Sequence, residues 1–218
     1  MPTGQDAAAA VTVGGRPSRR EADRRVTRLL AIAQRQFLAV GYADTTLEGI
    51  AHEAGVSKKT LYHHFGSKAG LFTTILETLC SEWIADLNDI VLSARRPEQV
   101  LNDVALHLLE VGTRADMIGL YRLFLIEAHR FPDLVQEISD KHGTMRGMEP
   151  LSDYLHAAVA AGRLRIGDVT LATDQFVQLV LGGVRQKLLL GVARRPRAAE
   201  RRRIARQAVA IFLSGCGT

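Results

Sequence analysis

Apolar residues recur along most of this chain at the three- and four-residue spacing of an amphipathic helix, and almost nowhere at the two-residue spacing of a strand. The first apolar stripe comprises Val26, Leu29, Leu30, Ala33, Phe37 and Val40. Gly41 follows it, at a place where glycine commonly ends a helix. The pattern predicts an all-α protein of about nine helices.

One expected helix is longer than the others. It runs from Ser67 to about Leu92, and its inward residues are Leu71, Phe72, Ile75, Leu79, Trp83, Leu87 and Ile90. The helices after it are separated by glycine and proline, which interrupt helices. Breaks are expected near Arg96-Pro97, Gly112 to Asp116, Phe131-Pro132, Gly162 to Gly167 and Ala193 to Pro196.

Two short helices are expected before the long one. Thr45 to Glu48 matches a capping box, in which Thr45 is the N-cap and the Glu48 side chain reaches back to it. Gly55 can adopt the positive φ of a sharp turn, and Ser57 can cap the second short helix. This arrangement predicts two short helices that cross at a steep angle.

The second short helix carries side chains that suit the major groove of DNA. With Leu61 turned inward, the outward residues are Lys58, Lys59, Thr60, Tyr62, His63 and His64. Lysine donates hydrogen bonds to guanine or phosphate, and threonine or tyrosine contacts a phosphate or a thymine methyl group. Two short helices of this kind predict a helix-turn-helix whose second helix reads DNA.

Positive charge is concentrated at two places in a chain with 28 Lys and Arg, 23 Asp and Glu, and a formal net charge of +5. The first is an N-terminal cluster with only Glu21 and Asp23 as acids, and its arginines are Arg16, Arg19, Arg20, Arg24, Arg25, Arg28 and Arg35. Beside a helix-turn-helix this cluster favours nucleic acid as the partner, and a solvated helix face is the alternative. The second, from Arg194 to Arg206, is interpreted as the outer face of the last helix, with a second nucleic-acid patch as the alternative.

The run GVSKKTLYHHFGSKAGLF, from Gly55 to Phe72, resembles the recognition-helix signature of the tetracycline-repressor (TetR) family. The likeness extends back to Thr45 and is near-continuous. Two residues depart from the pattern: Gly49 lies inside the first short helix, and Lys59 stands where the family often has a small residue. The resemblance implies an N-terminal three-helix DNA-binding domain and a larger C-terminal helical domain for ligand binding and dimerisation.

The expected domain organisation has three parts: a disordered arm at residues 1–16, the helix-turn-helix domain at 17–66, and the effector-binding and dimerisation domain at 67–218. Carried over residue by residue, the resemblance places Thr46 and Lys68 against phosphates, at the starts of two helices. It assigns base reading and nearby phosphate contacts to Lys58, Lys59, Thr60 and Tyr62. His63 and His64 are expected to contact the DNA backbone, and a packing or capping role is the alternative for His64.

The resemblance also implies a ligand pocket and a dimer interface in the C-terminal domain. Candidate pocket residues are Trp83, Leu87, Tyr121, Phe124, Leu125, His129, Tyr154, Phe176 and Leu179, each with ordinary core as the alternative. The last two helices, from about Asp168 to Gly191 and from about Pro196 to Leu213, are expected to pair with those of a second copy. Candidate interface residues are Leu171, Phe176, Leu179, Val180, Gly183, Leu188 and Ile211.

No enzyme chemistry stands out in the sequence. His52-Glu53 lacks the second histidine of a zinc protease, and no glycine-rich phosphate loop or nucleophile elbow occurs. Cys80 and Cys216 form no metal or disulfide pattern, and no apolar stretch reaches the roughly 18 residues of a membrane span. We therefore expect a cytoplasmic protein without enzyme activity, cofactor, metal ion or membrane attachment.

The function expected from the sequence is that of a ligand-responsive transcriptional repressor. As a homodimer it would bind a palindromic duplex DNA operator and leave it when a small apolar or amphipathic effector binds. One alternative is an activator of the same fold. The other is a helical small-molecule-binding protein with a vestigial DNA-binding module. The exposed set of Lys58, Thr60, Tyr62 and Lys68 favours DNA binding, because a vestigial module need not keep it.

Overall fold

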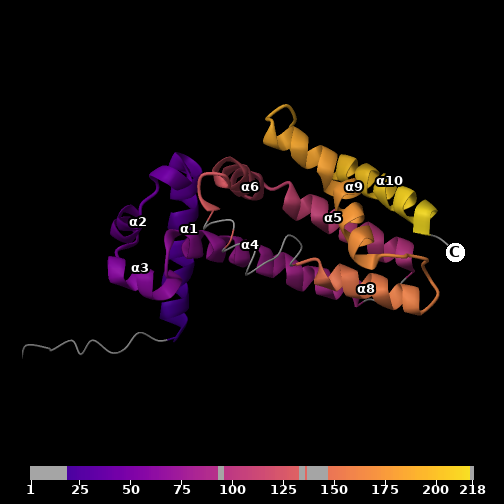
Figure 1. Cartoon of the computed structure of the whole chain (residues 1–218), viewed down its shortest axis with the longest axis horizontal. Coiled ribbons are helices and arrows are strands. Elements are labelled where there is room, and N and C mark those ends of the chain that lie inside the picture. Colours follow the sequence, from indigo (N-terminus) through magenta and orange to yellow (C-terminus); the bar gives the residue numbers. More distant parts are fainter. Residues whose placement is uncertain (1–18, 93–95, 133–135, 137–146, 217–218) are drawn as a thin grey trace, which may run out of the picture.

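The computed structural model describes residues 19–92, 96–132, 136 and 147–216, and all regular structure in these residues is helical (Figure 1). The helices are α1 (Arg19–Asp44), α2 (Leu47–Ala54), α3 (Lys58–Phe65), α4 (Lys68–Val91), α5 (Pro97–Gly112), α6 (Ala115–Glu127), α8 (Glu149–Ala160), α9 (Val169–Leu189) and α10 (Ala198–Cys216). The all-α prediction is confirmed. Within these ranges, no helix has both the length and the apolar composition that crossing a membrane requires. The arm expected at 1–16 lies outside the described residues.

Serine side chains set where α3 and α4 begin. The Ser57 hydroxyl oxygen accepts a hydrogen bond from the Thr60 amide at 3.1 Å, and that of Ser67 accepts one from the Gly70 amide at 2.9 Å. Each serine satisfies a backbone donor that the first helical turn would otherwise leave unpaired. The expected reader α3 and the long helix α4 therefore start where the sequence predicts.

The start of α2 differs from the prediction by one residue. Thr46 is the N-cap, and its hydroxyl oxygen accepts the Gly49 amide at 3.1 Å. Thr45 is 1% exposed and donates its hydroxyl to the Gly41 carbonyl at 2.6 Å, so it belongs to the end of α1. The predicted capping box at Thr45 is therefore wrong, and the Glu48 side chain is left for another contact.

An N-terminal core joins α1, α2, α3, the first half of α4 and, from the C-terminal part of the chain, α6. At its centre Phe72 meets Phe37 and Tyr42 edge to face, with ring centroids 5.3 Å and 5.7 Å apart. Leu120 and Leu123 of α6 are buried in the same cluster. The helix-turn-helix thus shares its core with two helices, α4 and α6, from outside the domain expected at 17–66.

The apolar stripe of α1 ends earlier than the sequence suggests. Val40, expected to point inward, is 55% exposed. Gly41 has φ 90°, which kinks the chain there, and beyond the kink Tyr42 occupies the inward position and is 4% exposed. Helical spacing indicates the face on which Val40 lies, but not whether the core extends to the last turn before the kink at Gly41.

A second core fills the C-terminal body between the far part of α4 and helices α5, α8, α9 and α10 (Figure 1). Leu87 of α4 is fully buried in it, as are Leu101 of α5 and Leu155 of α8. Phe176 of α9 packs against Phe212 of α10 with ring centroids 5.0 Å apart. The long helix α4 therefore runs from one core into the other.

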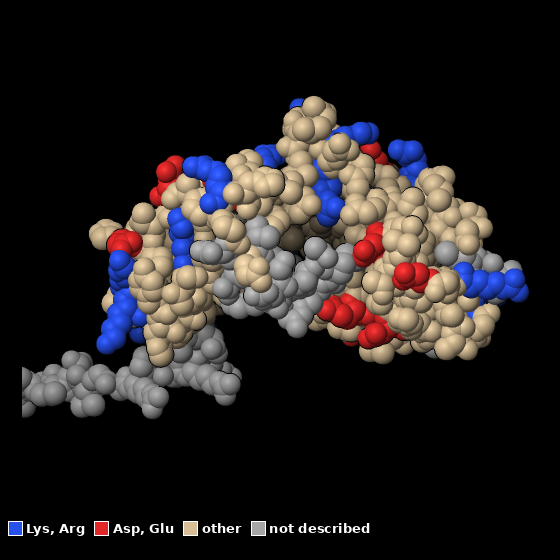
Figure 2. Space-filling model, viewed as in Figure 1, with Lys and Arg blue, Asp and Glu red and all other residues tan. Residues whose placement is uncertain are grey.

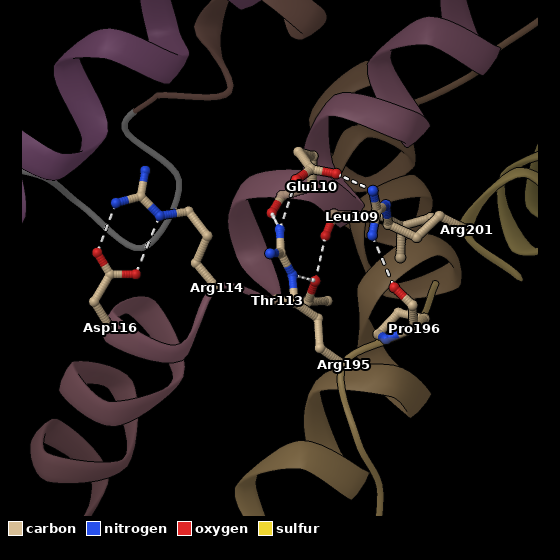
Figure 3. Close-up of polar contacts among 8 residues, drawn as sticks. All are labelled: Leu109, Glu110, Thr113, Arg114, Asp116, Arg195, Pro196 and Arg201. Atoms are coloured by element: carbon tan, nitrogen blue, oxygen red, sulfur yellow. Dashed lines mark hydrogen bonds and ion pairs between the residues drawn. The ribbon is translucent and has the colours of Figure 1, made fainter. Parts of the chain in front are cut away.

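A polar cluster fastens α10 and the loop before it to the end of α5 (Figure 3). The Glu110 carboxylate accepts a hydrogen bond from Arg195 at 2.7 Å and forms an ion pair with Arg201. Arg201 also donates to the Pro196 carbonyl at 2.8 Å, and Arg195 donates to the Thr113 hydroxyl at 3.3 Å. Because one carboxylate holds both guanidinium groups, the cluster fixes α10 against α5.

Candidate nucleic-acid interface

A tight turn sets the angle between α2 and α3. Gly55 ends α2 in the left-handed conformation, with φ 68°, which glycine adopts without strain. The Val56 amide then donates to the Ala51 carbonyl at 3.0 Å. Ile50 of α2 and Leu61 of α3 meet in the core below, 0% and 1% exposed. The buried side of each short helix is thus fixed, and the rest of α3 faces away from the protein.

The far end of α3 is held by close contact with α4. A Cβ atom at Gly70 would lie 2.1 Å from the Phe65 carbonyl oxygen, so only glycine permits this approach. Together with the Gly55 turn, this contact fixes both ends of α3 on the body of the domain. A rigidly held helix is what groove recognition requires, because a small error in its placement would misalign every contact.

The outward face of α3 consists of the side chains that the sequence predicts. Those that are exposed are Lys58, Lys59, Tyr62, His63 and His64. Thr60 is half-buried, and its hydroxyl lies 2.8 Å from that of Ser57. Figure 2 shows Lys or Arg side chains over the outer end of α3, at the left of the described chain. The DNA contacts of these residues stay a prediction, and their exposure is consistent with it.

Lys58 is engaged with an acid of the preceding helix. Its ammonium forms an ion pair with the carboxylate of Glu48 on α2, and it lies 5.6 Å from the centre of the Tyr62 ring. The hydrogen bond from Lys58 lowers the pKa of Glu48, and the same bond raises the pKa of Lys58. The carboxylate therefore stays ionised at neutral pH and holds this lysine in an ion pair.

The other side chains of this region that are predicted to contact DNA are accessible to solvent. The rings of His63 and His64 lie 5.6 Å apart, and the His64 ring is 6.0 Å from that of Phe65. Thr46 is exposed, and its hydroxyl oxygen accepts the bond that caps α2. A hydroxyl that accepts one hydrogen bond still has its own hydrogen to donate. Thr46 can therefore cap the helix and contact a phosphate at the same time.

The Lys68 side chain is bound by backbone carbonyls at the end of α1. Its ammonium donates hydrogen bonds to the carbonyls of Tyr42 at 2.6 Å, Ala43 at 3.2 Å and Thr45 at 3.0 Å. An ammonium has three donors, and these carbonyls use all of them. Lys68 thus ties the start of α4 to the end of α1 in the free protein, and its phosphate contact stays a prediction.

The same lysine lies at a junction with α6. Its ammonium is 4.5 Å from the centre of the Tyr42 ring and 5.8 Å from that of Phe131, which follows α6. Burial lowers the pKa of Lys68, while the carboxylates of Glu127 and Asp44 act in the opposite direction. The contacts around Lys68 thus connect the helix-turn-helix with the end of a helix from the C-terminal part of the chain.

The predicted pocket residues do not gather at one place. Leu87, Tyr154 and Phe176 lie in the C-terminal core, whereas Phe124 packs against the N-terminal core. The residues that face solvent instead are Tyr121, Leu125, His129 and Leu179. Trp83 belongs to α4, but its side chain is outside those described. Tyr121 and Leu125 are exposed because α6 turns its other face, with Leu120 and Leu123, inward, and the pocket assignment stays a prediction.

The predicted interface residues divide in a similar way. Phe176 and Val180 are 0% and 1% exposed, so they belong to the core and not to a surface. The residues that remain on the surface of α9 and α10 are Leu171, Leu179, Gly183 and Ile211, and Leu188 is half-buried. Leu179 and Gly183 also line a groove of about 250 Å³ between the two helices. The surface set stays a prediction for the dimer interface.

Acidic residues on α2 were missed by the sequence interpretation. Glu48 was assigned to a helix cap, and it pairs with Lys58 instead. Glu53 forms an ion pair with Arg35 of α1 and accepts a hydrogen bond from Gln36 at 2.6 Å. Both glutamates lie on the exposed side of α2, and that amphipathic pattern was the signal available in the sequence.

A helix-turn-helix that presents lysine and tyrosine on a rigidly held second helix, joined to a larger helical body, defines a DNA-binding transcriptional regulator. Two family models match this chain. Residues 29–75 match the bacterial regulatory proteins of the tetR family, and residues 99–216 match the C-terminal domain of AefR-like transcriptional repressors. The chain belongs to the TetR family.

Known proteins agree with this assignment. The HTH-type transcriptional regulator YvkB of Bacillus subtilis strain 168 is 27% identical over 172 residues, which cover 75% of this chain and 83% of YvkB. A putative TetR-family regulator from Mesorhizobium loti has a similar structure, with a TM-score of 0.78, 26% identity, and coverage of 93% of this chain and 100% of the other. The flavonoid-responsive regulator FrrA gives a TM-score of 0.72 and 27% identity over 89% of this chain and 98% of its own.

Proposed function

We propose that this chain is a dimeric transcriptional repressor that binds a palindromic operator and leaves it when a small apolar or amphipathic molecule binds. The observation that carries the proposal is the rigidly held α3, whose outward face presents Lys58, Lys59 and Tyr62. The match of residues 99–216 to AefR-like repressors supports repression as the direction of control. A two-fold dimer would place two copies of α3 in major grooves about one helical turn apart.

Recognition of bases is assigned to exposed residues of α3 that the protein does not use for its own folding. Lys59 is exposed, and Tyr62 is 47% exposed. We expect Lys59→Ala or Tyr62→Ala to relax the base preference at one operator position, because a specific contact discriminates by about 1–3 kcal/mol. The measurement is a comparison of sequence profiles selected from a random duplex pool. Identical profiles for the wild type and both variants would place the readers elsewhere.

Dimerisation is assigned to the exposed apolar residues of α9 and α10. Leu171 is 52% exposed, Leu179 42% and Ile211 47%, so each leaves apolar area in water in a single copy. Gly183 lies among them, and a Cβ atom built there would meet nothing within 4 Å, so this position leaves room for a second copy to approach. A two-fold axis would place each helix pair against its own copy.

Coupling between ligand and operator is assigned to α6. Its Leu120 and Leu123 are buried in the N-terminal core. From the opposite face, the Arg122 guanidinium donates to the carbonyls of Leu188 and Leu189, both at 3.0 Å, at the end of α9. A shift of α6 would therefore act on the helix-turn-helix and on the proposed dimer helix together. An effector that binds the shifted arrangement better would lower operator affinity.

The ligand proposal is tested by a reciprocal titration. The named similarity to a flavonoid-responsive regulator supports a flat aromatic effector as the first choice, so the probes are a flavonoid series and a matched aliphatic series. Trp83 is the only tryptophan and provides the fluorescence signal. We expect an effector to bind free protein roughly 5–150-fold more tightly than the operator complex, which corresponds to a coupling of about 1–3 kcal/mol. Equal affinity for both forms would exclude that molecule as an inducer.

A further inference from the structure

The reader helix carries one lysine whose charge is neutralised by the protein itself. The Lys58 ammonium forms an ion pair with the Glu48 carboxylate, although both side chains are well exposed, at 50% and 58%. Thr46 supplies the hydroxyl that caps α2, and the Glu48 carboxylate, in the first turn, also accepts a hydrogen bond from its own backbone amide. A carboxylate on this face also repels the phosphates that DNA would bring to it. Glu48 therefore has a second effect besides its favourable place in the first turn of α2, because it neutralises a cation of the reader helix.

The contacts around Lys58 restrict where its ammonium can point. Glu48 holds it from the side of α2, and the Tyr62 ring centre lies 5.6 Å away along α3. Because a lysine stem is long and flexible, a free Lys58 would reach any nearby phosphate. The Lys58 ammonium has donors left for a phosphate, but a phosphate bound there would lie close to the Glu48 carboxylate, and the two anions would repel each other. A base edge imposes no such penalty, since guanine offers neutral acceptors and cytosine offers a donor to Glu48.

We propose that Glu48 is a specificity-determining residue that withholds Lys58 from phosphates and directs it to a base edge. On this proposal Glu48 weakens binding to arbitrary DNA more than binding to the operator, and so raises the ratio between the two affinities. The proposal deepens the operator-binding function and rests on it.

The test compares the wild type with Glu48→Gln, which keeps the shape of the side chain and removes its charge. The DNA probes are a duplex of random sequence and the duplex recovered by selection with the wild type. We expect Glu48→Gln to bind the random duplex about five-fold or more tightly and the selected duplex with little change. For the random duplex, the slope of log affinity against log salt should become steeper by about 0.9 for each subunit, because each freed Lys58 adds about one phosphate contact.

Two controls separate this mechanism from a general change of charge. Glu53→Gln removes an equal charge from the same helix, but Glu53 pairs with Arg35 and Gln36 of α1 instead of with the reader. It should therefore leave the ratio of the two affinities nearly unchanged. In a Lys58→Met background, Glu48→Gln should no longer tighten binding to the random duplex by more than about two-fold, since the lysine that it would free is absent.

The outcomes are distinct. The proposal is supported if Glu48→Gln tightens binding to the random duplex more when Lys58 is present than in the Lys58→Met background. The same tightening in both backgrounds would overturn it, because Glu48 would then act only as a diffuse negative charge. Unchanged binding of both duplexes by Glu48→Gln would also overturn it. If the wild type itself binds neither duplex at low salt, the operator-binding function fails first, and this inference fails with it.

Discussion

Replacing Lys68 by methionine is expected to lower the free energy of unfolding by about 2–4 kcal/mol, because hydrogen bonds to a charged group contribute about 1.5–3 kcal/mol each and do not add fully. The ammonium of Lys68 binds three carbonyls at the end of α1. Methionine keeps the length of the side chain and leaves these carbonyls without their donor. Thermal and urea unfolding of the full chain, followed by circular dichroism, measure the change.

Two further variants make the Lys68 result specific. Lys59→Met removes an equal charge from an exposed position of α3 and should change stability by less than about 0.5 kcal/mol. Lys68→Arg should recover only part of the loss, because a planar guanidinium cannot direct its donors to carbonyls grouped around one point. A Lys68→Met variant that is as stable as the wild type, but binds all DNA sequences more weakly, would support the phosphate contact that the sequence suggested.

Introducing a carboxylate at both Leu179 and Ile211 is expected to produce a monomer that binds the operator at least 100-fold more weakly. The two residues are 42% and 47% exposed, so glutamate at these positions should leave the single subunit folded. In a two-fold interface, the same substitutions would bury unpaired charges against each other, which is strongly unfavourable. A monomer can occupy only one half-site at a time and loses the advantage of simultaneous binding.

Light scattering and operator titration on the same samples test the dimer. Ile126→Glu is the control, since Ile126 is 60% exposed and lies on α6, outside the two helices assigned to the interface. It should remain dimeric and keep its operator affinity. A Leu179→Glu/Ile211→Glu variant that stays dimeric would place the interface elsewhere, and a monomer with full affinity would contradict recognition by a dimer.

Local signals made much of the N-terminal half predictable from the sequence. Ser57 and Gly55 bound α3 where hydroxyl capping and the left-handed turn require, and Leu61 is buried as its spacing predicts. The cap of α2 was misplaced because Thr45 and Thr46 are chemically equivalent candidates. Only the fold shows that Thr45 is buried and bonded to the Gly41 carbonyl.

Contacts between distant residues could not be predicted from local spacing. Lys68 stands at the start of a helix, where a phosphate contact is a reasonable expectation, but its acceptors lie 23 to 26 residues earlier in the chain. The face that each helix of the C-terminal body turns inward depends on all its neighbours. The apolar spacing of α6 therefore could not show that Leu120 is buried while Leu125 is 47% exposed.

Selection from a random duplex pool is the most direct test of the claim that this TetR-family chain reads duplex DNA through α3 as a two-fold dimer. The full-length wild type should enrich a palindrome whose half-sites are about one helical turn apart. The enrichment should weaken steeply as salt increases, because each neutralised phosphate releases counterions. A pool without any enriched sequence at low salt, or one that yields only single half-sites, would contradict the claim.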